Sequence, residues 1–244
     1  VLELPTDRSR PAAPSYQGGR FDLELGQGLG DALKQVARQQ GVTLFMLLLA
    51  SLHTLLHRYS GQADIRIGVP VANRNRAETE GLIGFFVNTQ VLKAGFETGS
   101  TVAGLLQQVK QTALQAQAHQ DLPFEQLVEA LQPERSLSRS PLFQVIFNHQ
   151  TEVKGQARQL NGLRVEGFSA EKHTAQFDLA FNTYEREEGV GASLLYASDL
   201  FDAATVERMA GHWRNLLEAM AADVSQRIAD LPLLSAVETS QTVR

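Results

Sequence analysis

The segment Leu44–Arg58 constrains the fold more than any other part of this 244-residue chain. It reads LFMLLLASLHTLLHR and follows Thr43, whose hydroxyl can cap a helix. A helix that is apolar on nearly every side must be buried inside the protein. Its longest apolar run, Leu44–Ala50, is also far shorter than the roughly 20 residues that a membrane span needs. The chain must therefore build a core that surrounds this helix, and a chain of this length can do so.

Patterns on either side of this helix alternate between the period of a strand and the period of a helix. Further helices are predicted from Leu29 to a stop at Gly41, from a cap at Thr101 to Ala118, over 124–131, and from a cap at Asp202 to Met220. Strands are predicted at 19–25, 65–69, 85–92, 143–148, 163–168, 177–184 and 192–197. This order predicts an α/β (α+β) fold, in which helices flank a mixed β-sheet.

The two ends of the chain differ from this central part. Residues 1–16 contain three prolines and four charged side chains, which predicts an extended linker or arm. Residues 17–234 then form one domain, and the polar tail 235–244 is predicted to be disordered. The chain begins with Val1 rather than Met and has no signal-peptide pattern, so we expect a piece of a longer polypeptide.

The composition excludes several classes of function. With 43% hydrophobic and 20% charged residues, the chain has the composition of an ordinary globular domain. Its formal net charge of −5 gives no basic field for nucleic acid or an anionic membrane, so neither is expected as a partner. The absence of cysteine excludes disulfides, thiolate nucleophiles and cysteine-based metal sites, and it is compatible with the expected cytoplasmic location.

Two histidines on the apolar helix have the spacing of a zinc-binding helix. The sequence from His53 to His57 is HTLLH, which lacks the glutamate that follows the first histidine in that motif. It also lies within a run of leucines, so we predict a structural role for both rings and no metal site. Gly26, Gly28 and Gly30 lack the spacing and the lysine of a phosphate loop.

The segment His119-Gln120-Asp121 lies at the end of a predicted helix and has two interpretations. In the first, it is a corner between helices, where Asp121 caps the helix begun by Pro123 and His119 lies beside the preceding helix dipole. In the second, His119 and Asp121 form a catalytic pair. The corner is favoured, because no Ser or Cys nucleophile lies nearby in the sequence.

Two arginines follow the predicted strand at 65–69, in the segment Val71-Ala72-Asn73-Arg74-Asn75-Arg76. This segment is either a solvated loop or a site where one arginine binds a carboxylate from an adjoining element. Arginine suits the second arrangement, because its planar guanidinium can donate two parallel hydrogen bonds.

Residues 83–90, 119–125 and 135–143 are three separated segments that resemble motifs of the condensation domains of nonribosomal peptide synthetases. Residues 83–90, IGFFVNTQ, resemble I/V-G-x-F-V-N-T, and residues 119–125, HQDLPFE, resemble HQD-x-PFE. Residues 135–143, RSLSRSPLF, resemble R-D-x-S-R-x-P-L, with Ser136 in place of the usual aspartate. The resemblance assigns the following residues to the motifs or the tunnel lining: Gly84, Phe86, Asn88, Thr89, His119, Gln120, Asp121, Pro123 and Arg139.

Other segments extend the resemblance over almost the whole chain. Leu4–Pro11 is similar to the segment that opens the second half of these domains. Phe177–Leu179 and Tyr196–Phe201 are similar to its late strands, and Leu231–Leu234 to the start of the linker toward an adenylation domain.

The resemblance implies a chloramphenicol acetyltransferase-like fold, in which two similar halves form a V around a reaction tunnel. The family's catalytic HHxxxDG motif lies in the first half, and this chain contains no adjacent pair of histidines. The chain then corresponds to the C-terminal half and is expected to be inactive alone. Arg74 would pair with the aspartate of the missing motif. Residues 71–84 would form the tunnel floor, and 148–160 would belong to a segment that crosses to the other half.

The implied reaction joins two substrates that carrier domains present on phosphopantetheine arms. The amine of an acceptor aminoacyl thioester attacks a donor acyl or peptidyl thioester, and an amide forms. No bound cofactor or metal is implied. The implied partners are the N-terminal half, peptidyl carrier domains and the adjacent adenylation domain. This half would contribute geometry, and holding two reactants in register can supply up to ~7–11 kcal/mol of a barrier reduction.

Two alternatives stay open. An epimerisation or cyclisation relative would share the fold, although the forms Val87-Asn88-Thr89 and Pro123-Phe124-Glu125 favour condensation. A non-catalytic module that docks carrier domains is the second alternative.

Overall fold

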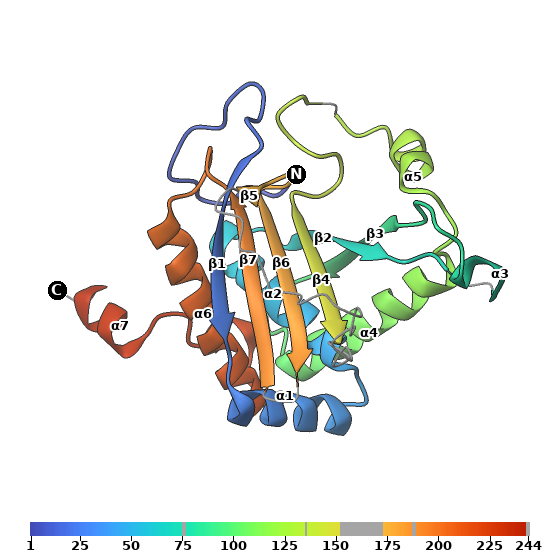
Figure 1. Cartoon of the computed structure of the whole chain (residues 1–244). Coiled ribbons are helices and arrows are strands. Elements are labelled where there is room, and N and C mark those ends of the chain that lie inside the picture. Colours follow the sequence, from blue (N-terminus) through green and yellow to red (C-terminus); the bar gives the residue numbers. More distant parts are fainter. Residues whose placement is uncertain (75–76, 135, 152–172, 187–188, 243–244) are drawn as a thin grey trace, which may run out of the picture.

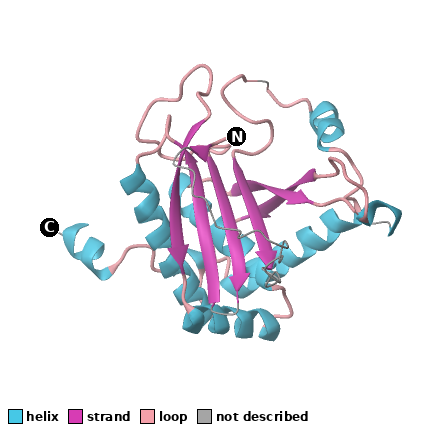
Figure 2. Cartoon of the chain, in the orientation of Figure 1, coloured by secondary structure: helices cyan, strands magenta, loops and turns pink. Residues whose placement is uncertain are grey.

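The computed structural model describes residues 1–74, 77–134, 136–151, 173–186 and 189–242. Its centre is a seven-stranded sheet with the order β3-β2-β4-β6-β7-β1-β5 (Figures 1 and 2). The strands are β1 Gln17–Glu24, β2 Asp64–Val71, β3 Asn88–Gly95, β4 Val145–Thr151, β5 His173–Thr174, β6 Leu179–Arg186 and β7 Gly189–Ala197. The helices are α1 Gln27–Gln39, α2 Leu44–Ser60, α3 Ala77–Glu80, α4 Val102–Ala118, α5 Phe124–Leu131, α6 Ala203–Ala222, the 3-10 turn η1 Ile228–Asp230 and α7 Ala236–Thr242.

The sheet is mixed, as the sequence predicts. β4 runs parallel to β2 and to β6, and the remaining pairs are antiparallel. β4 and β6 pair from Val145 opposite Leu179 to Thr151 opposite Glu185. α2, α4 and α6 lie behind the sheet in the view of Figure 1, and α1 lies at its lower end. The α/β class with helices flanking a mixed sheet is therefore confirmed.

The apolar helix α2 is buried in the core, as predicted. All ten residues of Leu47–Leu56 are buried, and the Thr43 hydroxyl accepts a hydrogen bond from the Met46 N–H at 3.2 Å. Trp213 of α6 donates a hydrogen bond to the Ser51 hydroxyl at 2.8 Å. In the part of the chain that the structure describes, no single helix is long and apolar enough to cross a bilayer. α1 and α2 reach that threshold only together, with a bend of 103° between them.

The strand predicted at 85–92 begins later than expected. β3 starts at Asn88 because β2 ends at Val71, opposite Asn88, so the residues before Asn88 have no strand to pair with. Residues 85–87 lie in a loop instead, and the side chain of Phe85 is 91% exposed. The strand predicted at 163–168 lies outside the described residues.

Asp202 occupies the cap position of α6, but its carboxylate does not cap the helix. The carboxylate binds Arg8 instead. Asp7 takes over part of the capping role, because its carboxylate accepts from the Asp202 N–H at 2.8 Å and from the Thr205 hydroxyl at 2.9 Å. The prediction of a helix start at Asp202 is confirmed, and the predicted role of its side chain is wrong.

Residues 235–242 include a helix, whereas the sequence pattern predicts disorder from Ser235. The Ser235 N–H and hydroxyl both donate to Glu238, at 2.8 and 2.6 Å, and the Glu238 N–H donates back to the Ser235 hydroxyl at 3.3 Å. This reciprocal pattern is a capping box, whose signal is a serine followed three residues later by a glutamate. The sequence contains that signal at Ser235 and Glu238, within a segment whose polar composition is typical of a disordered tail.

Candidate functional site

Most of the predicted site residues gather around the first residue of β3, in what we call the Asn88 group. The group comprises the loop before β3, the corner between α4 and α5, and the start of α5. Within it, Asn73, Phe86, Asn88, Asp121 and Phe124 line a pocket of about 280 Å³. Arg139 lies apart from this group and lines a second, larger cleft.

The side-chain amide of Asn88 joins these elements through four hydrogen bonds. Its oxygen accepts from the Phe124 N–H at 3.1 Å and from the Thr89 N–H at 2.9 Å. Its nitrogen donates to the carbonyls of Gln120 at 3.0 Å and Leu122 at 2.8 Å. An amide has two donors and two acceptor positions, so its hydrogen-bonding capacity is fully used here.

The Asn88 side chain therefore caps α5 from a neighbouring strand, in the role that the sequence pattern gives to Asp121. The cap position of α5 is occupied by Pro123, whose side chain cannot cap. The amide from the neighbouring strand supplies the acceptor that the helix needs. At the end of α4 the His119 carbonyl accepts from the Leu122 N–H at 3.2 Å, and the His119 side chain is exposed. This backbone geometry is that of a corner between two helices.

Arg74 binds backbone carbonyls within its own loop. Its guanidinium donates to Leu82 at 2.8 Å, to Gly84 at 3.5 Å and to Thr79. It also lies 4.3 Å from the centre of the Phe86 ring, a cation–π contact. A planar guanidinium can do both at once, so Arg74 fixes the shape of the loop rather than extending into solvent. Arg76 lies outside the described residues.

The loop that Arg74 holds has an apolar, exposed tip, which we call the 82–87 loop. Leu82 is 54% exposed, Ile83 104%, Phe85 91% and Val87 48%. Contiguous apolar surface of this kind marks an interaction site in most folded domains.

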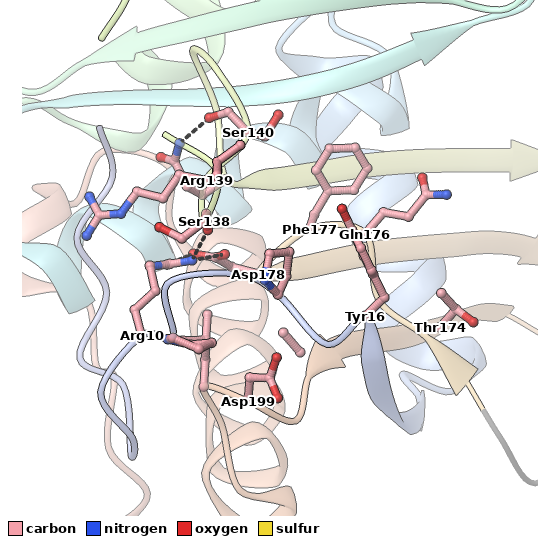
Figure 3. A pocket seen from close by; sticks show the side chains of 16 residues that line it. Arg10, Tyr16, Ser138, Arg139, Ser140, Thr174, Gln176, Phe177, Asp178 and Asp199 are labelled. Atoms are coloured by element: carbon pink, nitrogen blue, oxygen red, sulfur yellow. Dashed lines mark hydrogen bonds and ion pairs between the residues drawn. The ribbon is translucent and has the colours of Figure 1, made fainter. Parts of the chain in front are cut away.

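The larger cleft, of about 650 Å³, is built around an ion pair that the sequence patterns did not predict (Figure 3). Arg10 donates to one Asp178 oxygen at 2.8 Å and also binds the other, and it donates to the Ser138 carbonyl at 3.0 Å. The side chains of Arg10 and Asp178 are only 18% and 12% exposed. Both residues lie in segments that resemble the family, but their separation in sequence hides their pairing.

The segment 136–144 holds the N-terminal arm on the other side of this cleft. The buried side chain of Gln144 accepts from the Leu2 N–H at 2.7 Å and donates to the Ser140 carbonyl at 3.0 Å. Arg139, a predicted site residue, lies 3.9 Å from the Glu3 carboxylate. In this structure Arg139 therefore faces the arm and the cleft, not the Asn88 group.

Three phenylalanines connect the Asn88 group to the cleft. The ring of Phe143 lies 5.6 Å from Phe124 of α5 and 5.4 Å from Phe177, which lines the cleft. Phe143 packs against Gly68 of β2, where a Cβ atom would come within 2.4 Å of the ring. Glycine is required at that position because any side chain would collide with Phe143.

The two histidines of the HTLLH segment lie in packed positions. Burial lowers the pKa of His53 to about 3, so its ring is neutral in the core. The ring of His57 stacks on Phe96 at 4.2 Å, and its Nδ1 lies 2.8 Å from the Gln62 carbonyl. Both positions agree with the structural role predicted from the sequence.

The condensation domain family model matches residues 1–243, so the chain belongs to the condensation domain family. It is 49% identical over 245 residues to one of the subunits of linear gramicidin synthase from Brevibacillus parabrevis, covering 100% of this chain and 3% of that protein. It is 37% identical over 244 residues to surfactin synthase subunit 1 of Bacillus subtilis (strain 168), covering 100% of this chain and 7% of that protein. The chain is therefore a small part of the length of these nonribosomal peptide synthetases.

Solved structures share the fold. The X-domain from teicoplanin biosynthesis is 33% identical, with a TM-score of 0.88 over 96% of this chain and 53% of the X-domain chain. The condensation domain of the monacolin K polyketide synthase MokA is 19% identical, with a TM-score of 0.80 over 93% of this chain and 52% of that chain, which shows the fold alone. The chain spans about half the length of each of these solved chains.

Proposed function

We propose that this chain is the C-terminal half of a nonribosomal peptide synthetase condensation domain. Its coverage of 53% and 52% of the solved chains supports a half-domain of a chloramphenicol acetyltransferase-like fold. The three motif segments of the second half of the family support the same assignment. In this proposal the HHxxxDG motif belongs to the other half, and this chain alone forms no amide.

The reaction is the attack of an acceptor amine on a donor thioester, with loss of the donor's thiol. Both substrates arrive on phosphopantetheine arms of carrier domains, and this chain holds no cofactor of its own. Its partners are the N-terminal half, the carrier domains and an adenylation domain, and its location is cytoplasmic. The residues of this half act by positioning: they form a wall of the tunnel and hold its floor in one shape.

The observation that carries the proposal is the 82–87 loop. Arg74 holds the loop's carbonyls and Asn88 fixes its end, yet Ile83 and Phe85 are almost fully exposed. An apolar loop held in a defined shape is suited to a fixed partner surface rather than to solvent. The occupant we propose is the missing half of the domain.

A second observation supports a tunnel wall on the sheet face opposite the helices. Phe147, Phe181 and Leu194 pack in the core, so the residues next to them in each strand point to the other face. The register aligns four of those residues in one row across β1, β7, β6 and β4: Asp22, Ser193, Asn182 and Asn148. Asp22 is exposed, Asn148 and Asn182 are half-buried and Ser193 is buried, so the accessible part of this polar row suits a tunnel wall.

The test uses carrier domains loaded with donor and acceptor thioesters. Amide formation is measured by mass spectrometry with this chain alone, and with the intact domain that contains both halves. We expect product only from the intact domain. Product from this chain alone, at a rate above buffer, would end the half-domain assignment.

A second candidate is a non-catalytic docking module. It is favoured by one comparison, since the X-domain from teicoplanin biosynthesis has been solved in complex with OxyB and is 32% identical to this chain. If the intact domain binds loaded carrier domains but forms no amide, the docking module replaces the condensation half. An epimerised donor without amide would instead identify an epimerisation relative.

A further inference from the structure

Three segments that lie apart in the sequence meet at the side chain of Asn88. The 82–87 loop ends at Asn88. The corner 119–123 supplies the two carbonyls that accept from the Asn88 nitrogen, and the first residue of α5, Phe124, supplies a backbone N–H that donates to the Asn88 oxygen. Two of these segments belong to different family motifs. The Asn88 amide is therefore the point where both motifs are joined.

Within the described residues, α5 has few other contacts that could fix its position. None of its residues is buried, and its first turn is capped by Asn88 rather than by its own N-cap residue. Its ring contact with the body of the domain is Phe124 against Phe143. A helix of eight residues is marginal without such support, so its placement depends on the amide.

The 82–87 loop is joined to Asn88 through the backbone rather than through the amide. Arg74 binds the loop to itself, through the carbonyls of Leu82 and Gly84 and the ring of Phe86. The loop's attachment to the sheet begins where Asn88 pairs with Val71. A shift of the loop would therefore pull on the amide and, through it, on α5.

We propose that Asn88 is a positioning residue, which makes the 82–87 loop and α5 move as one unit in the proposed condensation reaction. The inference rests on the proposed function for its catalytic consequence, but the coupling itself does not. Three hydrogen bonds of the amide go to the corner 119–123 and to α5, so neither of these can shift relative to Asn88 without leaving a donor or an acceptor unpaired. The 82–87 loop is joined to Asn88 directly through the backbone.

The experiment compares three variants. Asn88→Ala removes all four hydrogen bonds. Asn88→Asp keeps the two acceptor contacts to the Phe124 and Thr89 N–H groups but loses the donors to the Gln120 and Leu122 carbonyls. Thr43→Ala is the matched control, because it removes the cap of α2, a helix outside the Asn88 group.

The first measurement is hydrogen exchange in this chain. In Asn88→Ala we expect exchange to accelerate by at least ~10-fold in residues 82–87 and 119–131 together, as two or more hydrogen bonds are lost. Thr43→Ala should lower the melting temperature and leave both segments unchanged relative to the rest of the chain. Acceleration confined to one segment would overturn the coupling.

The second measurement is amide formation by the intact domain. In Asn88→Ala we expect kcat to fall ~10–100-fold with little change in KM for the loaded acceptor carrier, since positioning rather than binding is lost. In Asn88→Asp, activity relative to the unmodified domain should recover as pH is lowered, because protonation of the introduced carboxylate restores one donor toward the carbonyls. A role limited to stability would show the recovery in the melting temperature and leave the kcat of the folded domain unchanged.

The outcomes separate the two proposals. If the unmodified intact domain forms no amide, the proposed function is wrong. The hydrogen exchange of residues 82–87 and 119–131 then decides by itself whether the loop and α5 are coupled. If the unmodified domain is active and Asn88→Ala keeps its kcat, the proposed function stands and Asn88 is not a positioning residue.

Discussion

Arg10 binds both carboxylate oxygens of Asp178, although the two residues are 168 positions apart in the sequence. The pair joins the N-terminal arm to the residue just before β6, and Arg10 also binds the Ser138 carbonyl. One guanidinium thus holds three segments around the larger cleft. Such a bidentate pair adds geometric specificity as well as free energy.

Arg10→Ala should strongly destabilise the chain. Removing one partner leaves the mostly buried Asp178 unpaired, which costs about 3–5 kcal/mol in the free energy of unfolding. Arg8→Ala is the control, because its pair with Asp202 is about half exposed and should contribute less than about 1 kcal/mol. Urea unfolding measures both. Equal midpoints for the two variants would show that the Arg10–Asp178 pair contributes no more to the free energy of unfolding than the Arg8–Asp202 pair.

The sequence predicted those parts of the fold that depend on local patterns. α2 and its Thr43 cap follow from the apolar run, and the Thr101 hydroxyl accepts from the Gly104 N–H at 3.2 Å as expected. Residues 124–131 form α5 with the predicted bounds. In each case the residues that form the sequence pattern also make the contacts that define the helix or its cap.

Apart from the capping box of Ser235 and Glu238, the main contacts that the sequence did not predict join residues far apart in the chain. Asn88 caps α5 from 36 residues away, whereas the local sequence pattern indicates Asp121. The partner of Asp178 could not be read from either segment, because pairing depends on which strands become neighbours. Sequence motifs thus indicated segments of the candidate site, while the sheet order decided which side chains meet.

Arg74→Ala should damage the intact domain more than Arg76→Ala. Arg74 holds the carbonyls of Leu82 and Gly84 and stacks on Phe86, so its loss frees the loop. By resemblance it also occupies the position that pairs with the aspartate of HHxxxDG. Turnover and melting temperature should both fall in Arg74→Ala. If the two variants match each other in both measurements, the assignment of Arg74 is wrong.

The exposed 82–87 loop predicts self-association of the chain when the other half is absent. Ile83 and Phe85 present apolar surface that no described residue covers, and such surface tends to be buried by association. Ile83→Ser should therefore raise the monomer fraction in sedimentation experiments. Adding the N-terminal half should have the same effect on the unmodified chain. Association that persists unchanged in both cases would place the contact elsewhere.

Gly68→Ala should destabilise the chain by about 1–3 kcal/mol, because the added methyl group would overlap the Phe143 ring. The shift of Phe143 should also disturb its contacts with Phe124 and Phe177. Gly211→Ala is the matched control, since nothing lies within 4 Å of a Cβ at that position in α6. There the substitution should stabilise the chain by about 0.5–1 kcal/mol through helix propensity. Thermal unfolding would reveal opposite signs for the two variants, and equal signs would contradict the packing argument.

Acid should release α7 from α6 through a single carboxylate. Hydrogen bonds from the Ser235 hydroxyl, the Ser235 N–H and His212 lower the pKa of Glu238 from an ordinary 4.5 to about 2. A lowered pKa means that the folded chain favours the ionised form. The stabilisation is therefore fully present above pH 4.5 and is lost as pH falls toward 2.

The contacts around His212 indicate how this release can be observed. Burial raises the pKa of Tyr59 to about 12, so its hydroxyl stays neutral, and it forms a hydrogen bond with His212 Nδ1 at 2.7 Å. The other ring nitrogen then donates to Glu238 at 3.0 Å, and the ring bridges α2 and the tail. Protonation of Glu238 makes its carboxyl group a weaker acceptor for the hydrogen bond from His212. NMR of the His212 ring and the exchange of residues 235–242 should therefore change together between about pH 5 and 2.

Glu238→Gln should abolish that acid transition in the tail, because the glutamine amide does not titrate. Asp199→Asn serves as the control: hydrogen bonds from the Ser15 N–H and hydroxyl lower the pKa of Asp199, so it responds to acid in the same direction but holds the N-terminal arm. The control should keep the transition in residues 235–242 and lose protection near Ser15. If the tail of Glu238→Gln still shows the acid transition at the same pH, Glu238 is not the group that holds α7.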